Sequence, residues 1–174
     1  ASPSTQGSFP ANLNRDEAIV PAGSRPSDNV ATAKIGAKTS LTAFDSGGAK
    51  VLYDFYYTRI DNDASGNPQW EVSVYRQDQS TNGGFPYTAT PAANLVQEKV
   101  TLVFDPATNK LKTGTPASPT SITIDNTLKK TNEVCATRPI TTTNALIRGN
   151  QGDPPRLQLR ICTLAIGFQR ALKR

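Results

Sequence analysis

Alternating apolar and polar residues between Leu41 and Asp78 limit this chain to a β-sheet fold. The sequence reads LTAFDSGGAKVLYDFYYTRI over residues 41–60 and, after a polar loop, QWEVSVYRQD over residues 69–78. A period of two with many β-branched and aromatic residues is typical of strands that bury one face. Gly47 and Gly48 supply the backbone freedom that a tight hairpin turn requires. The pattern predicts a hairpin of strands near 39–45 and 50–59, followed by a third strand.

The aromatic residues of these strands predict which face is buried. Tyr53, Phe55 and Tyr57 occupy alternate positions, so we expect them to share the core face. Trp70 begins the third strand, and we expect it to be largely buried against the 50–59 strand.

The remaining tyrosines are the candidate functional residues. Tyr56 falls on the opposite face of its strand, together with Leu52, and we expect that face to be half exposed. Exposed aromatic side chains are common where a protein meets another subunit or a carbohydrate. We therefore name Tyr56, Tyr75 and Tyr87 as a possible contact surface for a subunit or a ligand. Packing in the core is the ordinary alternative for such residues.

Composition excludes most catalytic chemistry. The 174 residues include no His, which removes the usual general base and the commonest metal ligand. We therefore expect no enzyme activity, no catalytic residues, no cofactor and no metal. No run of about 18 apolar residues occurs, so we expect no membrane span.

Two features resemble metal or redox sites only at first sight. Residues 61–67 place oxygen-bearing side chains as a calcium loop does, but Val72 stands where the bidentate Glu is needed. A hairpin loop is the better interpretation. Cys135 and Cys162 are too few for a disulfide framework. Two unpaired thiols are favoured, although a single bridge between them stays open.

Charge divides the chain into unequal parts. Residues 1–133 hold 12 basic and 13 acidic residues, a net charge of −1, whereas residues 134–174 hold seven basic and one acidic residue, a net charge of +6. The basic segment has Phe168 as its one aromatic residue, so it lacks a stacking platform for nucleic acid. Solvated charge is the favoured interpretation.

These differences predict three parts: an extended lead-in over 1–29, a β-domain over 30–125, and a basic tail of uncertain origin over 126–174. A shifted reading frame, an artificial extension or an insertion particular to one lineage would each account for the tail. Within it, 157–161 is the best candidate for an added edge strand.

The order of motifs resembles the middle, outward-facing domain of bacterial flagellar hook proteins. The similarity lies in LTAFDSGGAKVLYDFYYTRI, PQWEVSVYRQD, the VTLVFDPATNKL segment of residues 100–111, the SITID segment of residues 121–125, and FPANLN at residues 9–14. It covers roughly residues 9–125. One motif departs from the family, because Gly47 stands where Leu is frequent.

The resemblance implies a structural role. Hook proteins build the flexible extracellular tube that joins the rotary motor to the filament, and they leave the cell by type III export. Their terminal helices assemble the inner tube, while the middle domain lies outside and slides against other hook subunits. The chain lacks a long apolar heptad pattern. We therefore expect a fragment without the polymerisation helices, monomeric in solution, that binds neither nucleic acid nor membrane.

The fold class that follows is all-β, a sandwich or distorted barrel of about seven to nine strands with a poorly matched basic tail. The rival function is a secreted carbohydrate-binding or adhesin module. An exposed planar row of aromatics, including Tyr75 or Tyr87, would favour that rival.

Overall fold

The computed structural model describes residues 3–9, 11–45, 47–125, 163–168 and 172–173. Within these ranges the regular elements are strands and short 3-10 turns, with no α-helix. The strands are β1 (Gln6–Phe9), β2 (Leu13–Asn14), β3 (Ala37–Phe44), β4 (Lys50–Ile60), β5 (Gln69–Arg76), β6 (Ser80–Thr81), β7 (Gly84–Tyr87), β8 (Gln97–Val103), β9 (Ser121–Asp125), β10 (Thr163–Phe168) and β11 (Leu172–Lys173). The 3-10 turns are η1 (Pro26–Asp28), η2 (Gln77–Gln79) and η3 (Ala92–Asn94).

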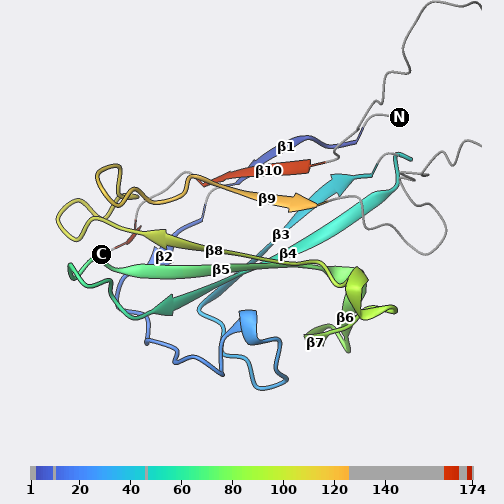
Figure 1. The fold of residues 1–174 in the computed structure, drawn as a ribbon, viewed down its shortest axis with the longest axis horizontal. Helices are drawn as coiled ribbons and strands as arrows, with labels where there is room; N and C mark the ends of the chain where they lie inside the picture. Colours follow the sequence, from blue (N-terminus) through green and yellow to red (C-terminus); the bar gives the residue numbers. More distant parts are fainter. Residues whose placement is uncertain (1–2, 10, 46, 126–162, 169–171, 174) are drawn as a thin grey trace, which may run out of the picture.

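Two sheets form the body of the molecule (Figure 1). The larger is antiparallel, with strand order β3-β4-β5-β8, and the smaller has the order β1-β10-β9. The pairs β11-β2 and β6-β7 are short additions. Side chains of β4, β5 and β9 share one buried cluster, so the sheets pack face to face. The predicted fold class, an all-β sandwich or distorted barrel, is confirmed.

The predicted hairpin is confirmed as β3 and β4. The strands pair antiparallel from Ala37 opposite Tyr57 to Phe44 opposite Lys50. In the turn, Oδ1 of Asp45 accepts hydrogen bonds from the backbone N–H groups of Gly47 (2.8 Å) and Ala49 (2.9 Å). This side-chain bonding explains an aspartate at the start of the turn.

Gly48 should resist substitution, because its φ is 81°. Side chains with a Cβ rarely adopt this left-handed backbone conformation. We expect Gly48→Val to lower the free energy of unfolding by about 1 kcal/mol or more, measured by denaturant titration. Gly114→Val is the matched control, since nothing lies within 4 Å of a Cβ built there. Equal effects of the two substitutions would show that the backbone conformation of Gly48 is not the cause.

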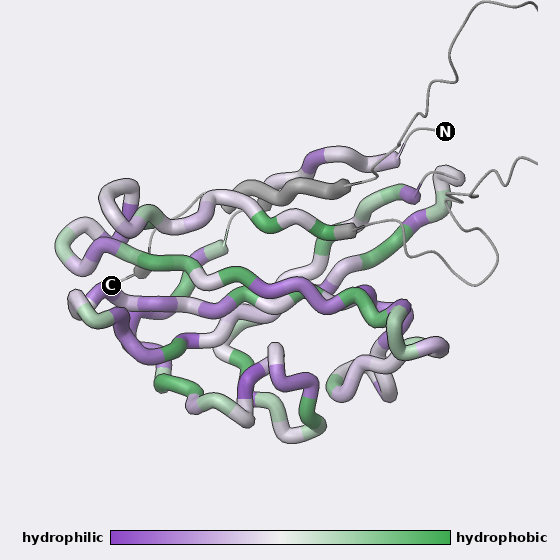
Figure 2. Tube along the Cα trace, in the orientation of Figure 1, coloured by the Kyte–Doolittle hydropathy of each residue, from purple (hydrophilic) through white to green (hydrophobic). Residues whose placement is uncertain are grey.

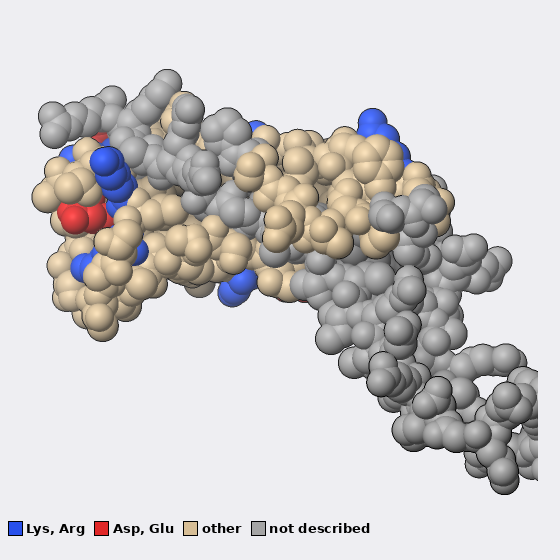
Figure 3. All heavy atoms as spheres, turned by 90° about the horizontal axis from the view of Figure 1, so that it is seen from above, with Lys and Arg blue, Asp and Glu red and all other residues tan. Residues whose placement is uncertain are grey.

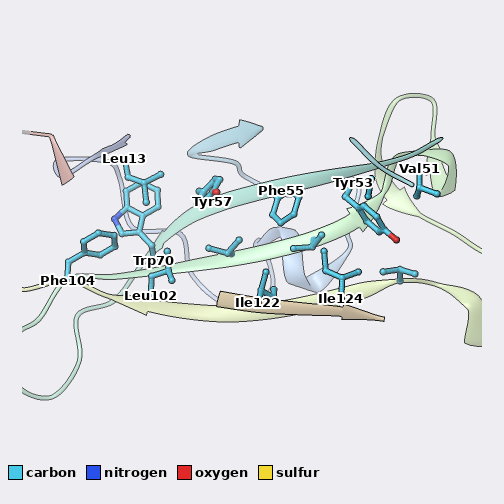
Figure 4. Close-up of a cluster of buried hydrophobic side chains, with 14 residues drawn as sticks. Leu13, Val51, Tyr53, Phe55, Tyr57, Trp70, Leu102, Phe104, Ile122 and Ile124 are labelled. Carbon is cyan, nitrogen blue, oxygen red and sulfur yellow. The ribbon is translucent and has the colours of Figure 1, made fainter. Parts of the chain in front are cut away.

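The predicted core face is confirmed. Tyr53 and Phe55 are 0% exposed, and Tyr57 and Trp70 are 1% exposed. Figure 4 shows these side chains between the larger sheet and Ile122 and Ile124 of β9. The rest of the cluster comprises Leu13, Ala43, Val51, Val72, Val74, Val96, Leu102 and Phe104.

The opposite face of β4 and β5 is also buried, contrary to the half-exposed face that the sequence predicts for Tyr56. Two segments cover it: residues 15–35, which include η1, and residues 77–96, which we call the flap and which include β6 and β7. Figure 1 shows both on the side of the large sheet away from β9. Hydropathy still varies from residue to residue along these strands, as the colours in Figure 2 show, because several buried residues of this second face are polar.

Local hydrogen bonds also explain the aspartates in two further turns, at Asp63 and Asp105. Oδ1 of Asp63 accepts from the backbone N–H of Ser65 (2.9 Å) and of Asn67 (2.8 Å), which closes the loop interpreted above as a hairpin loop. Asp105 bonds the backbone of Ala107 (2.7 Å) in the same way, before the antiparallel bridge between Phe104 and Leu111. The two segments of residues 100–111 and 121–125, which carry part of the family resemblance, contain this antiparallel bridge and strand β9, respectively.

Several expectations fall on residues outside the described ranges. These are the candidate edge strand at 157–161, Cys135 and Cys162. β10 comes from the segment expected to be a tail, and it pairs with both β9 and β1. The division of the chain at residue 125 stays a prediction.

Candidate contact face of the large sheet

The structure brings the three candidate tyrosines together but buries them. Tyr56 comes from β4, Tyr75 from β5 and Tyr87 from β7, with exposed fractions of 1%, 0% and 1%. The rings of Tyr75 and Tyr87 are stacked with centroids 4.4 Å apart, and Phe85 packs against all three tyrosines. The expected exposure is therefore wrong, because the flap covers this part of the sheet. Their role in contacting a subunit or ligand stays a prediction.

Each tyrosine hydroxyl in this cluster has a hydrogen-bond partner. The hydroxyls of Tyr56 and Tyr87 lie 2.6 Å apart, and that of Tyr87 also donates to Oδ2 of Asp54 at 2.8 Å. The hydroxyl of Tyr75 donates to the carbonyl of Pro26 at 2.7 Å. Buried tyrosines need such partners, so the network fixes the flap and the 15–35 segment on the sheet.

Asp54 is the centre of the network, and sequence reasoning did not assign it this role. Its side chain is 1% exposed, and it accepts a hydrogen bond from Ser40 at 2.6 Å. The ammonium of Lys38 lies 2.9 Å from Oδ2. A lone carboxylate between apolar neighbours in a strand, here Leu52 and Tyr56, was the available signal for a buried polar network.

A second anchor holds the flap by its backbone. The side-chain amide of Asn29 donates to the carbonyl of Tyr87 at 2.8 Å, and its oxygen accepts from the Tyr87 N–H at 2.7 Å. Asn29 thus supplies the two bonds that a neighbouring strand would supply. No sequence signal identified this contact, because the two residues are 58 positions apart.

Glu71 is the second buried carboxylate on this face, with 4% of its side chain exposed. It accepts a hydrogen bond from the hydroxyl of Ser27. Arg25 lies 3.9 Å and Lys99 3.8 Å from Oε2. The acid is thus bonded and paired, as a buried charge must be.

Three groups on this face, Tyr87, Tyr75 and Lys38, have raised pKa values. Burial, followed by the hydrogen bonds with Tyr56 and Asp54, raises the pKa of Tyr87 above its usual range. Burial likewise raises the pKa of Tyr75. Burial alone would lower the pKa of Lys38, but its bonds with Asp54 and Tyr56 outweigh this effect and raise the pKa.

These shifts predict alkaline lability. A group whose pKa is higher in the folded state contributes stability that is present below its unfolded pKa and lost as the pH rises through its folded pKa. The ordinary pKa values are 10.0 for Tyr and 10.5 for Lys. We therefore expect the thermal unfolding temperature to fall steeply above about pH 10. Tyr87→Phe should reduce the steepness, and an unfolding temperature that is constant through this range would contradict the prediction.

The hydrogen bonds and ion pairs of this face stabilise the fold. Among the described residues, no group of three or more His, Cys, Asp or Glu side chains could hold a metal ion. No helix in the described part is long and apolar enough to cross a membrane. The carboxylates of Asp54 and Glu71 are occupied by hydrogen bonds and cations.

Charged side chains are sparse on one face of the molecule. On the face shown in Figure 3, basic and acidic side chains are few and most of the described surface is uncharged. Three large apolar side chains are exposed among the described residues: Ile19 at 50%, Ile35 at 44% and Phe44 at 46%.

Comparison with known proteins identifies the family. A model of the family described as the flagellar basal body protein FlaE D2 domain matches residues 12–161. No curated protein and no solved structure matches the chain. The match takes in the hairpin β3–β4, the Trp-containing strand β5 and the strand β9, which carry the resemblance seen in the sequence. The family is structural and is not an enzyme family. The chain belongs to the FlaE D2 domain family and contains, over residues 12–161, the middle domain of a flagellar hook protein.

Proposed function

We propose that this domain is the outward-facing, extracellular module of the hook and touches neighbouring hook subunits through weak polar contacts. The observation that carries the proposal is the family match over residues 12–161. Within the matched region, we propose residues 30–125 as the main β-domain, preceded by the lead-in 1–29.

The exposed surface supports weak contacts. Stable interfaces contain a buried apolar centre, which a sparsely charged surface with few exposed apolar side chains does not supply. The exposed large apolar residues of the described part are Ile19, Ile35 and Phe44. A subunit that must move against its neighbours as the hook bends benefits from contacts that can be exchanged at low cost.

We propose that the isolated chain is monomeric and does not bind nucleic acid at physiological salt. The basic residues of 134–174 lack interleaved aromatic side chains, so attraction to phosphates would be non-specific and sensitive to salt. Sedimentation velocity over a range of protein concentrations tests the monomer, and a sequence-dependent complex with DNA at physiological salt would contradict the second statement.

Immunolabelling tests the location. Fab fragments raised against the purified chain and coupled to gold should label intact flagellated cells of the source organism at the short segment between the cell surface and the filament. Labelling should disappear when the Fab is first adsorbed with the purified chain. Label on the filament, or label that needs lysed cells, would contradict an outward-facing hook module.

Nothing in the described structure favours the carbohydrate-binding or adhesin alternative. An exposed row of aromatic side chains would have supported it. Tyr75 and Tyr87, the residues named for that role, are 0% and 1% exposed.

A further inference from the structure

The large sheet has two edges, and at each edge backbone N–H and carbonyl groups could form hydrogen bonds with another strand. β3 and β8 are the outer strands of the order β3-β4-β5-β8. In an antiparallel strand, successive residues direct their backbone groups to alternate sides. The hydrogen bonds that the ends of β3 and β8 make outside the sheet therefore show which residues direct their backbone groups outward.

At β8, the backbone of Val103 faces outward, because its N–H bonds Ser118 Oγ (3.0 Å) and its carbonyl accepts from the N–H of Lys112 (2.9 Å). Alternation then places the backbone groups of Lys99 and Thr101 on the same outer edge. Within the described part of the chain, no backbone hydrogen bond from outside the sheet reaches either residue.

β3 has the same arrangement at the other edge. The carbonyl of Phe44 accepts from the N–H of Ser4 (2.9 Å), and its own N–H donates to Ser4 Oγ (3.0 Å). Alternation places the backbone groups of Lys38, Ser40 and Thr42 on the outer edge. Among described residues, none has a backbone bond across that edge.

Each outer strand carries one lysine that is tied to a buried carboxylate on the adjacent inner strand. Lys38 of β3 lies opposite Tyr56 and reaches diagonally to Asp54 at 2.9 Å. Lys99 of β8 lies opposite Ser73 and reaches diagonally to Glu71 at 3.8 Å. The two lysine side chains remain 36% and 57% exposed. A diagonal ion pair between an edge lysine and a buried carboxylate thus occurs at both edges of one sheet.

We propose that Lys38 and Lys99 block strand-to-strand pairing of this sheet with a second copy of the chain. An added strand would lie about 4.8 Å away and would place its side chains beside the lysine ammonium, which would lose water. In a pairing of β8 with β3 of another copy, both lysines would lie on the same face of the continuous sheet and repel each other. Lysines on edge strands are a known protection against such pairing.

The ion pairs restrain the two ammonium groups near the edges. A free lysine can swing away from an edge, whereas Asp54 and Glu71 hold these ammonium groups over the inner strands beside the edge. Pairing β8 of one copy with β3 of the next is head-to-tail, so each added copy would present a further unprotected edge. The inference concerns the isolated chain and does not depend on the hook contacts proposed above.

The experiment removes the charge at one edge without leaving the buried Glu71 carboxylate unpaired, while Arg25, the other partner of Glu71, keeps its hydrogen bond to the carbonyl of Val20. Lys99→Val combined with Glu71→Gln neutralises both members of the pair and places a β-branched residue at the edge. We expect this variant to keep its native near-ultraviolet circular dichroism but to form oligomers that grow with concentration in sedimentation velocity. Wild type should stay monomeric. Lys110→Val is the matched control, because it removes the same charge from an exposed turn.

Amide hydrogen exchange identifies the surface that pairs. In the oligomer, the N–H groups of residue 99 and Thr101 should exchange at least ten-fold more slowly than in wild type, a factor that corresponds to about 1.4 kcal/mol. The inward N–H groups of Val100 and Leu102 are internal controls and should be slow in both proteins.

Three results would overturn the proposal. The first is a folded, monomeric double variant with unchanged exchange at Thr101. The second is a wild-type chain that already oligomerises with Thr101 protected. The third concerns a double variant that associates by unfolding, seen as loss of its native spectrum. The milder variant Lys99→Gln then decides, and the proposal is overturned if its Thr101 N–H is unprotected at high concentration.

Discussion

Replacing Trp70 with alanine is expected to lower the free energy of unfolding by about 3–5 kcal/mol. Trp70 is 1% exposed and lies in the buried cluster with Leu13, Tyr57 and Phe104 (Figure 4). A Cβ at Gly36 would lie 3.1 Å from the indole ring, so the backbone there is packed closely against it. Alanine would leave a cavity that this surrounding sheet cannot fill.

Two control variants separate the cavity from other causes. Among the described residues the indole N–H has no hydrogen-bond partner, so Trp70→Phe loses part of the ring but no hydrogen bond. Its cost should be well below that of alanine. Ile19→Ala removes an apolar side chain that is 50% exposed and should change stability by less than about 0.5 kcal/mol. A Trp70→Ala effect as small as that of Ile19→Ala would contradict the burial.

The sequence was sufficient to predict the hairpin, the third strand and the core face. Their signals are local: Gly48 marks the turn, and the period of two assigns Tyr53, Phe55 and Tyr57 to one side. A turn and the strands that flank it depend on neighbouring residues, so no knowledge of distant contacts was required.

The burial of Tyr56, Tyr75 and Tyr87 could not be predicted in the same way. The flap and the 15–35 segment cover them. In the 15–35 segment, the side-chain amide of Asn29 donates to the carbonyl of Tyr87, and the carbonyl of Pro26 accepts from the hydroxyl of Tyr75. Such contacts join residues far apart in the sequence, and neither segment has a regular period that would place it over a sheet. An alternating strand specifies two faces but not whether one or both are covered.

The domain boundary at residue 125 is the part of the sequence interpretation that truncation would decide. Unchanged thermal unfolding after removal of residues 126–174 would support the division. A lower unfolding temperature would mean that β10, which pairs with β9 and β1, completes the smaller sheet.

Asp54→Ala is expected to be the most damaging change to the second face, with a loss of about 2–4 kcal/mol. The side chain is 1% exposed, accepts hydrogen bonds from Ser40 and Tyr87, and forms an ion pair with Lys38. Removing it leaves a buried tyrosine hydroxyl with one partner fewer and an ammonium without its counter-charge. Lys38 is 36% exposed and can still be hydrated, which keeps the expected loss below that of a fully buried ion pair.

The size and place of the effect distinguish this network from an ordinary surface ion pair. Asp54→Asn keeps oxygen and nitrogen atoms for hydrogen bonds and should cost less than alanine, while Asp16→Ala, at an exposed acid, should be nearly neutral. In Asp54→Ala, amide exchange should quicken in the flap around Tyr87 before it quickens in β5, because Asp54 anchors that segment from β4. If exchange rises uniformly, or if Asp54→Ala matches Asp16→Ala in stability, the flap is held by ring packing and by Asn29, and the carboxylate is dispensable.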